Sequence, residues 1–336
     1  MYVKRMILFT SGLIIPCMAL ALLGGEYPDA KVTLKVVDEE GKSVEEAGAG
    51  IGFFGRKGED RKGKTDKDGI FSAQSPAHDG EFAFIVKKDG YYNTNGRDKV
   101  KMPDGKLEQK DGKWQPWNPT IEVVLKKMIN PVPMYAKRVE VEIPELNKEI
   151  GYDLVAGDWV APHGKGITTD IMIQATRDDR GGWKDFDCSL KLRFPNKGDG
   201  IQGYFIENYK VDKGSQLRLP HNAPINDYKD EISFSFGRTP EKGPYGYKAK
   251  DGQNYFLRIR SEVDGNGNII KAMYGKIYDD FIINFGGQRK TLGIRFIYYI
   301  NPDGTRNLEF DPKKNLLIPP GKEYDKEYND CTNLAP

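Results

Sequence analysis

The sequence predicts an all-β protein built of two β-sandwich domains. Apolar residues recur at every second position in many short segments, which is the pattern of strands with one buried face. Glycine is abundant, with 38 residues, and turns rich in Asp, Asn and Gly separate the segments. No stretch shows convincing helical periodicity. About 310 residues follow the first 25, which is too long for one small domain, so two domains are expected.

Residues 1–25 have the order of a secretory signal peptide. Two basic residues precede an apolar run over residues 6–23, and two glycines follow it, which is the order that export machinery recognises. An uncleaved anchor is one alternative, because the run is just long enough to span a bilayer, but Pro16 within the run favours cleavage. Lipid attachment at Cys17 is another, and Pro16 disfavours it because a small residue is expected there. The sequence therefore predicts an exported protein.

The predicted mature chain carries no net charge. Lys4 and Arg5 account for the whole excess of the 51 basic residues over the 49 acidic ones. Because nucleic acids and anionic membranes attract basic surfaces, neither is an expected partner. No membrane span is expected in the mature chain. The predicted location is the periplasm or the extracellular space, with association to the cell surface as a further expectation.

Residues 31–127 form one predicted unit of strands and turns. Val32, Leu34 and Val36 alternate with polar residues, as in a half-buried strand. A Thr-Asp-x-Asp-Gly sequence at 65–69 predicts a tight turn that opens another strand. The predicted strand segments, in chain order, are 32–36, 51–54, 70–71, 82–86 and 121–125.

Three pieces of this unit occur in the order found in a known domain family. They are Asp-x-x-Gly at 38–41, Thr-Asp-x-Asp-Gly-x-Phe at 65–71 and Lys-x-Gly-Tyr at 88–91. This succession resembles the carboxypeptidase regulatory-like domain, a small transthyretin-like Greek-key β-sandwich. The resemblance covers under a third of the chain and implies a structural or binding module without catalysis of its own. A long insert between Asn93 and Thr120 departs from the family pattern.

A proline-rich segment separates this unit from the rest of the chain. The sequence Asn-Pro-Val-Pro at 130–133 predicts extended backbone that cannot share a ladder, so residues 128–136 are predicted to be a linker. Alternating patterns recur over 137–310 and predict a larger β-sandwich domain. The sequence Asp-Gly-Asn-Gly-Asn at 264–268 is the clearest hairpin signal. Residues 311–336 show no periodicity and are predicted to be an irregular tail.

Cys188 and Cys331 are the two cysteines of the predicted mature chain. In an oxidising compartment they are expected to form a disulfide. Cys188 shares an alternating face with Leu190 and Leu192, and a bond to Cys331 would hold the tail against the domain. In the chain-entropy model, closing so long a loop stabilises the fold by about 4–5 kcal/mol. The alternative is one buried thiol and one exposed thiol.

The sequence contains no recognisable catalytic set. His78, His163 and His221 lie in separate loops rich in proline and glycine, without the spacing of a zinc site. No Gly-x-Ser-x-Gly turn is present to carry a nucleophile. Acidic neighbours such as Asp279 and Asp280 are expected by chance among 49 acidic residues and are predicted to be mostly solvated. No catalytic residue and no cofactor is therefore assigned.

Asp264, Asn266 and Asn268 copy the alternate oxygen ligands of a calcium loop. The full loop also requires Gly at its sixth position and a bidentate Glu at its twelfth. Those positions hold Ile269 and Gly275 in this chain. A plain hairpin turn is therefore favoured, and no metal site is assigned.

Two aromatic loop sequences supply the candidate binding residues. Trp114 and Trp117 lie in a polar stretch rich in glycine and lysine, and Tyr245 and Tyr247 lie in the sequence Gly-Pro-Tyr-Gly-Tyr. Exposed rings beside polar groups stack on sugars or anchor protein partners, because each ring buries a large area at little entropic cost. The alternative is that these rings fold back to cover one end of a sandwich.

Together these features predict an exported, non-catalytic binding or surface-interaction protein, with a glycan or a cell-surface protein as its partner. A secreted hydrolase that acts on polysaccharide, with a site assembled from distant loops, is the first alternative. Acids or histidines that converge in a deep cleft would support it. A structural subunit of an envelope assembly is the second alternative, and long unprotected edge strands would mark it.

Overall fold

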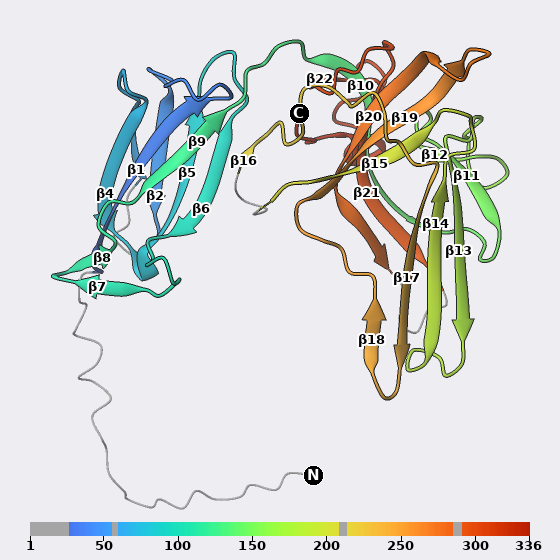
Figure 1. Cartoon of the computed structure of the whole chain (residues 1–336), viewed down its shortest axis with the longest axis horizontal. Helices are drawn as coiled ribbons and strands as arrows, with labels where there is room; N and C mark the ends of the chain where they lie inside the picture. The colour runs from blue at the N-terminus through green and yellow to red at the C-terminus, as the bar shows by residue number, and fades with distance from the viewer. Residues whose placement is uncertain (1–26, 56–59, 208–213, 285–290) are drawn as a thin grey trace, which may run out of the picture.

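The chain folds into two β domains that lie beside each other (Figure 1). The structure, a computed structural model, describes residues 27–55, 60–207, 214–284 and 291–336. Within these residues the regular structure is almost entirely strand, so the prediction of an all-β protein with two sandwiches is confirmed. The predicted signal peptide at 1–25 lies outside the described residues.

Two sheets face each other in the first domain. Its elements are β1 (Asp29–Asp38), β2 (Gly48–Phe53), β3 (Asp60–Lys64), β4 (Ile70–Pro76), η1 (His78–Gly80), β5 (Glu81–Lys87), β6 (Thr94–Lys99), β7 (Glu108–Lys110), β8 (Lys113–Gln115), β9 (Thr120–Leu125) and, from later in the chain, β16 (Gly214–Ser215). The β1 sheet has the order β4-β1-β8-β7, with β9 also on β1. The β5 sheet has the order β16-β6-β5-β2-β3.

The first-domain core lies between these two sheets. Val32, Leu34 and Val36, the alternating residues of the predicted opening strand, are completely buried. Ile51 and Phe82 from the other sheet belong to the same core. Successive side chains of a strand point to opposite faces. On the other face Lys35 is exposed, whereas Thr33 is buried and hydrogen-bonds to Ser72 and Asn118. The predicted burial of the apolar face of this strand is confirmed.

The second domain is also formed by two facing sheets. Its elements are β10 (Val132–Glu142), β11 (Glu149–Asp153), β12 (Asp158–Trp159), β13 (Ile171–Asp179), β14 (Phe186–Arg193), β15 (Gly200–Phe205), β17 (Glu231–Thr239), β18 (Gly243–Gly246), β19 (Gln253–Val263), β20 (Ile269–Asn284), β21 (Gly293–Asn301), β22 (Phe310–Asn315) and η2 (Lys326–Cys331). The β20 sheet has the order β15-β19-β20-β21-β10-β22. The β14 sheet has the order β12-β11-β13-β14-β17-β18.

Two hydrophobic cores stabilise the second domain. The larger one lies between the sheets and includes Leu190 and Phe234 from the β14 sheet and Leu257 and Phe296 from the β20 sheet. A smaller core covers the outer face of the β20 sheet, where Leu334 near the end of the chain packs with strand residues. Burying apolar area at roughly 25 cal/mol per Å² is the main stabilising term of such a sandwich.

Residues predicted to be linker and tail belong to the second domain, which corrects two predicted boundaries. β10 begins at Val132, inside the predicted linker, and Pro133 falls at an irregular register between β10 and β22 where a residue without an N–H is tolerated. β22 and η2 occupy the predicted tail. The Asn315 amide donates to the carbonyl oxygens of Ala136 at 2.6 Å and Cys331 at 2.7 Å. Polar anchoring of this kind leaves no periodic signal.

The hairpin predicted at 264–268 is confirmed. The turn joins β19 to β20, which pair antiparallel. The Asp264 carboxylate accepts hydrogen bonds from the backbone N–H groups of Asn266 at 2.9 Å and Asn268 at 2.8 Å. The Asp264 carboxylate, which resembles a calcium ligand in the sequence, therefore stabilises the turn by hydrogen bonds to its backbone.

The predicted disulfide is absent from the structure, where Cys188 and Cys331 are both free and both buried. Cys188 lies on β14 and faces the core between the sheets, whereas Cys331 lies in η2 beside β10 of the opposite sheet. Burial raises the pKa of the Cys188 thiol to about 11. Both side chains therefore act as small apolar groups, and neither matches the exposed thiol of the alternative.

Strand pairing and hydrogen bonds join the two domains. β16, which lies in the chain between β15 and β17, pairs antiparallel with β6 and so extends the first-domain β5 sheet. Glu309 is 1% exposed and accepts hydrogen bonds from the Tyr92 hydroxyl at 2.8 Å and the Ile129 N–H at 2.8 Å. The Asn130 N–H also donates to Glu309, at 3.2 Å.

Candidate functional site

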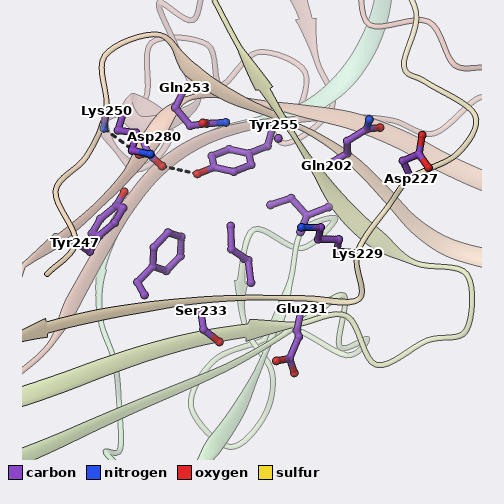
Figure 2. A pocket seen from close by; sticks show the side chains of 14 residues that line it. Gln202, Asp227, Lys229, Glu231, Ser233, Tyr247, Lys250, Gln253, Tyr255 and Asp280 are labelled. Atoms are coloured by element: carbon purple, nitrogen blue, oxygen red, sulfur yellow. Dashed lines mark hydrogen bonds between the residues drawn. The ribbon is translucent and has the colours of Figure 1, made fainter.

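A cleft of about 790 Å³ opens between the two sheets of the second domain, where β15 and β19 face β17 (Figure 2). Ile201, Ile232 and Phe234 supply apolar side chains to this cleft, and Tyr247 and Tyr255 supply two aromatic rings. A concave site with apolar and aromatic walls and a few fixed polar groups is typical of a small-ligand site. This cleft is the candidate functional site.

An irregularity in β20 brings a carboxylate into the cleft. The register between β20 and β21 shifts between Tyr278 and Ile282, and Asp279 has a φ of 64°. A bulge of this kind re-aims a side chain at the expense of regular pairing. Asp280 consequently lines the cleft and is 6% exposed. The expectation that this acidic residue is solvated is wrong.

Three donors surround the Asp280 carboxylate. Oδ1 accepts hydrogen bonds from the Tyr255 hydroxyl at 2.5 Å and the Phe281 N–H at 2.9 Å, and Oδ2 accepts one from the Lys250 N–H at 2.9 Å. Burial, followed by the hydrogen bond to Asp280, raises the pKa of Tyr255. The phenol therefore remains a donor across the physiological pH range, and the ring is held in one position (Figure 2).

The segment that crosses from the β14 sheet to the β20 sheet brings Tyr247 into the cleft. The Tyr247 hydroxyl donates to the carbonyl oxygen of Phe281 at 2.6 Å, and the Tyr247 ring meets the Phe234 ring edge-on at a centroid distance of 4.6 Å. Burial raises the pKa of Tyr247. Both tyrosines of the cleft are therefore fixed by a hydrogen bond at one end and by packing along the ring.

Polar side chains surround the mouth of the cleft. Asp227, Lys229, Lys250 and Gln253 line it (Figure 2). Within the described parts of the chain, neither Lys229 nor Lys250 has an ion-pair partner, so both ammonium groups are available to a ligand. Ser233 and Glu231 alternate with the inward residues of β17, and Figure 2 shows their side chains pointing away from the cleft.

Gly203 keeps one wall of the cleft open. It lies on β15 directly opposite Tyr255 of β19. A Cβ atom placed there would have one neighbour within 4 Å, the Gln253 Nε2 atom at 3.2 Å, which is the end of a flexible side chain. A larger residue at this position would therefore enter the cleft without colliding with the backbone.

The structure separates the four predicted aromatic residues. Trp114 is only 5% exposed and donates from Nε1 to the Ala77 carbonyl oxygen at 2.8 Å, in the first-domain core. Trp117 is half-buried, with the Lys113 ammonium 4.9 Å from its ring centroid. Tyr247 lies in the cleft, whereas Tyr245 lies on the outer face of the β14 sheet. Of the four, the cleft contains one.

Sequence reasoning missed Tyr255 and Asp280. A usable signal was present, because the polar pair 279–280 interrupts an apolar alternation within β20. Such an interruption in a central strand is typical of a bulge. The partner of Asp280 could not be identified in this way. The predicted hairpin pairs β19 with β20, but the register shifts on either side of these residues, which the sequence does not specify, bring Tyr255 to Asp280.

The three histidines do not converge. His78 lies in η1, His163 is 3.5 Å from a Glu145 carboxylate oxygen, and the His221 ring nitrogen Nε2 contacts the Lys127 carbonyl oxygen at 2.8 Å. Among the described residues, no group of three or more histidine, cysteine or acidic side chains is placed to hold a metal ion. The same residues contain no helix that is both long and apolar enough to cross a membrane.

Comparisons with known proteins leave the family open, since no family model and no curated protein matches the chain. Solved structures show distant similarity. A 3-chlorocatechol 1,2-dioxygenase from Rhodococcus opacus 1CP is 12% identical, with a TM-score of 0.26, over 31% of this chain and 62% of that one. A DUF3823 family protein from Parabacteroides merdae is 13% identical, with a TM-score of 0.20, over 74% of this chain and 96% of that one. BcpA, the major pilin subunit of Bacillus cereus, is 13% identical, with a TM-score of 0.21, over 80% of this chain and 95% of that one. At such TM-scores none of these similarities bears on function.

Proposed function

We propose that this protein is an exported, non-catalytic binding protein whose cleft holds a saccharide. The half-buried Tyr247 ring, set beside the buried Tyr255 ring over an apolar floor, is the observation that carries the proposal. A sugar ring has apolar faces that pack on aromatic rings and hydroxyl groups that hydrogen-bond to a polar rim. Lys229, Lys250 and Gln253 supply such a rim.

The state of Asp280 favours binding over hydrolysis. A glycosidase needs a carboxylic acid that exchanges a proton with the substrate and a second carboxylate at a set distance. The oxygens of Asp280 are already occupied by the hydroxyl and N–H donors described above. This carboxylate therefore fixes the Tyr255 ring and orients the crossing segment. The polysaccharide hydrolase remains the alternative, and cleavage of an oligosaccharide during the binding experiment below would support it.

The signal peptide and the resemblance of the first domain extend the proposal. Residues 1–25 direct the chain out of the cytoplasm, and residues 31–127 act as a carboxypeptidase regulatory-like module beside the binding domain. The partner is a glycan in the periplasm or on the cell surface. A cell-surface protein is the other partner that the sequence suggests, and a glycan explains the small concave cleft better, because protein interfaces of useful affinity are larger and flatter.

Filling the cleft tests the proposed function. Isothermal titration calorimetry would measure binding of short oligosaccharides of glucose, xylose, mannose and galacturonic acid. We expect Gly203→Phe to weaken binding by at least about tenfold, because the new ring occupies the cleft. Gly203→Ala is the matched control and should bind within about threefold of the original protein. Undiminished binding by Gly203→Phe, with an unchanged melting temperature, would place the ligand elsewhere.

A further inference from the structure

The outer face of the β14 sheet carries a second depression, on the opposite side of that sheet from the cleft. Its volume is about 430 Å³, and residues of β13, β14, β17 and β18 line it. Outward side chains on these strands alternate with core residues, as Ser189 does with Leu190. The depression shares no lining residue with the cleft. The two surfaces are therefore separate.

A tyrosine ring lies across the sheet at one end of this depression. Tyr245 of β18 pairs with Gly237 of β17, which in turn pairs with Asp187 of β14. The Tyr245 hydroxyl donates to Asp187 and so reaches over the intervening strand. A Cβ atom at Gly237 would collide with the end of the Tyr245 ring. The ring therefore rests on the glycine backbone, and Tyr245 is still 39% exposed.

Small hydroxyl side chains form the floor beside the ring. Ser235, Ser189 and Thr176 stand at paired positions on three adjacent strands, and the hydroxyl oxygens of Thr176 and Ser189 are 2.7 Å apart. Because these side chains are short, the floor is lower than the ring next to it. The row gives a line of donors and acceptors that runs across the strands.

Carboxylates border the same row. Asp187 and Asp178 occupy paired positions on β14 and β13. Arg180 Nη1 donates to Asp187 Oδ2 at 2.6 Å and to Asp178 Oδ2 at 3.3 Å. The arginine holds both groups in place, and each carboxylate has further lone pairs for ligand hydroxyl groups.

We propose that this depression is a second saccharide site, which binds an extended neutral polysaccharide across the strands of the β14 sheet. A sugar ring stacks on the exposed face of Tyr245, and the next residues of the polymer hydrogen-bond to the serine and threonine row. The depression lies on the outer face of the sheet, where a chain can continue across the strands in both directions. Arg177 pairs with Asp179 and Arg180 pairs with Asp178 and Asp187, so the positive charges at the depression are offset by carboxylates and do not attract an acidic polymer, which favours a neutral one. This inference rests on the proposed function and adds a ligand class and a surface to it.

Substitution at Tyr245 tests the second site. Affinity electrophoresis in gels that contain β-glucan, xylan, galactomannan or polygalacturonate would measure polymer binding by the full-length protein. We expect the protein to bind at least one neutral polymer and Tyr245→Ala to weaken that binding by at least about tenfold. Tyr245→Phe keeps the ring and should bind within about threefold. Ser235→Leu, which fills the floor and leaves the ring, should also weaken polymer binding.

The same variants separate this inference from the proposed function. Tyr245→Ala and Ser235→Leu should bind short oligosaccharides in the cleft as the original protein does, and their melting temperatures report folding. Loss of polymer binding in Gly203→Phe together with full binding in Tyr245→Ala would overturn the second site and leave the cleft proposal standing. Preference for polygalacturonate, or retention by none of the four polymers, would overturn the second site as well.

Discussion

At the scale of single residues, Asp280 determines the geometry of the cleft. A buried carboxylate is costly unless its oxygens are hydrogen-bonded, and three donors satisfy Asp280. Tyr255 is the side-chain donor among them, and its ring forms a wall of the cleft. The Tyr247 hydroxyl donates to a neutral acceptor, the carbonyl oxygen of Phe281, and also lies near the charge of Asp280. The two tyrosines therefore differ in what their hydroxyl groups contribute to stability.

This difference predicts unequal costs for removing the two hydroxyl groups. Tyr255→Phe leaves a buried carboxylate with one donor fewer and should lower the free energy of unfolding by about 1.5–3 kcal/mol. Tyr247→Phe loses a hydrogen bond to a neutral acceptor and should cost about 0.5–1.5 kcal/mol. Urea unfolding of both variants measures the difference. Equal losses, or a larger loss for Tyr247→Phe, would contradict the role assigned to Asp280.

At the scale of elements, the end of β18 explains why two neighbouring tyrosines serve different surfaces. Residues two apart in a regular strand share a face, and the sequence places Tyr245 and Tyr247 at that spacing. Gly246, with a φ of 93°, ends the strand between them. The chain then leaves the β14 sheet, so Tyr245 stays on its outer face while Tyr247 turns into the cleft. The sequence identified both tyrosines as candidates, but it did not predict that the strand ends at Gly246 between them.

Gly246 is therefore expected to be sensitive to substitution. A Cβ atom at Gly246 would collide with the Ser235 carbonyl oxygen, and a positive φ is unfavourable for alanine. Gly243 has a φ of 69° but no atom within 4 Å of a Cβ atom, so Gly243→Ala is the matched control. Gly246→Ala should lower the free energy of unfolding by at least about 1 kcal/mol more than Gly243→Ala. Similar unfolding midpoints for the two variants would refute the steric explanation.

An element can be predicted from the sequence where a local pattern, either alternating burial or turn chemistry, specifies it. The alternation at Val32, Leu34 and Val36 and the turn at 264–268 were sufficient, because local period and turn chemistry determine both. The β20 bulge and the ordered tail were not predicted. Asp280 and Asn315 are positioned in part by hydrogen bonds to residues far away in the sequence, Tyr255 and Lys250 for Asp280 and Ala136 for Asn315, and such contacts leave no local pattern. The same limit explains why a disulfide was expected where two separate buried thiols occur.

At the scale of the whole molecule, the interface makes the two domains depend on each other. Glu309 of the second domain accepts hydrogen bonds from Tyr92 of the first domain and from the backbone of Ile129 and Asn130. β16 adds strand pairing to the same interface. Domains linked only by a short flexible segment move independently by default. The buried hydrogen bonds here favour a fixed arrangement.

Removal of Glu309 should uncouple the domains. Glu309→Ala leaves the Tyr92 hydroxyl and two backbone N–H groups without their acceptor, which should lower the free energy of unfolding by about 3 kcal/mol or more. Differential scanning calorimetry should show one transition for the original protein and two for the variant. Glu241→Ala, at an exposed position, is the control and should retain one transition. A single, unshifted transition in Glu309→Ala would show that the domains are not coupled through this residue.

β16 has a consequence for any attempt to produce the first domain alone. The domain boundary lies before β10, so a protein truncated there would lack the short strand that pairs with Thr94 and Asn95 at one end of β6. The backbone groups at Thr94 and Asn95 that pair with β16 would then be open to a second copy of the same fragment. Such a fragment should dimerise or precipitate, and a peptide that includes residues 214–215 supplied in trans should keep it monomeric.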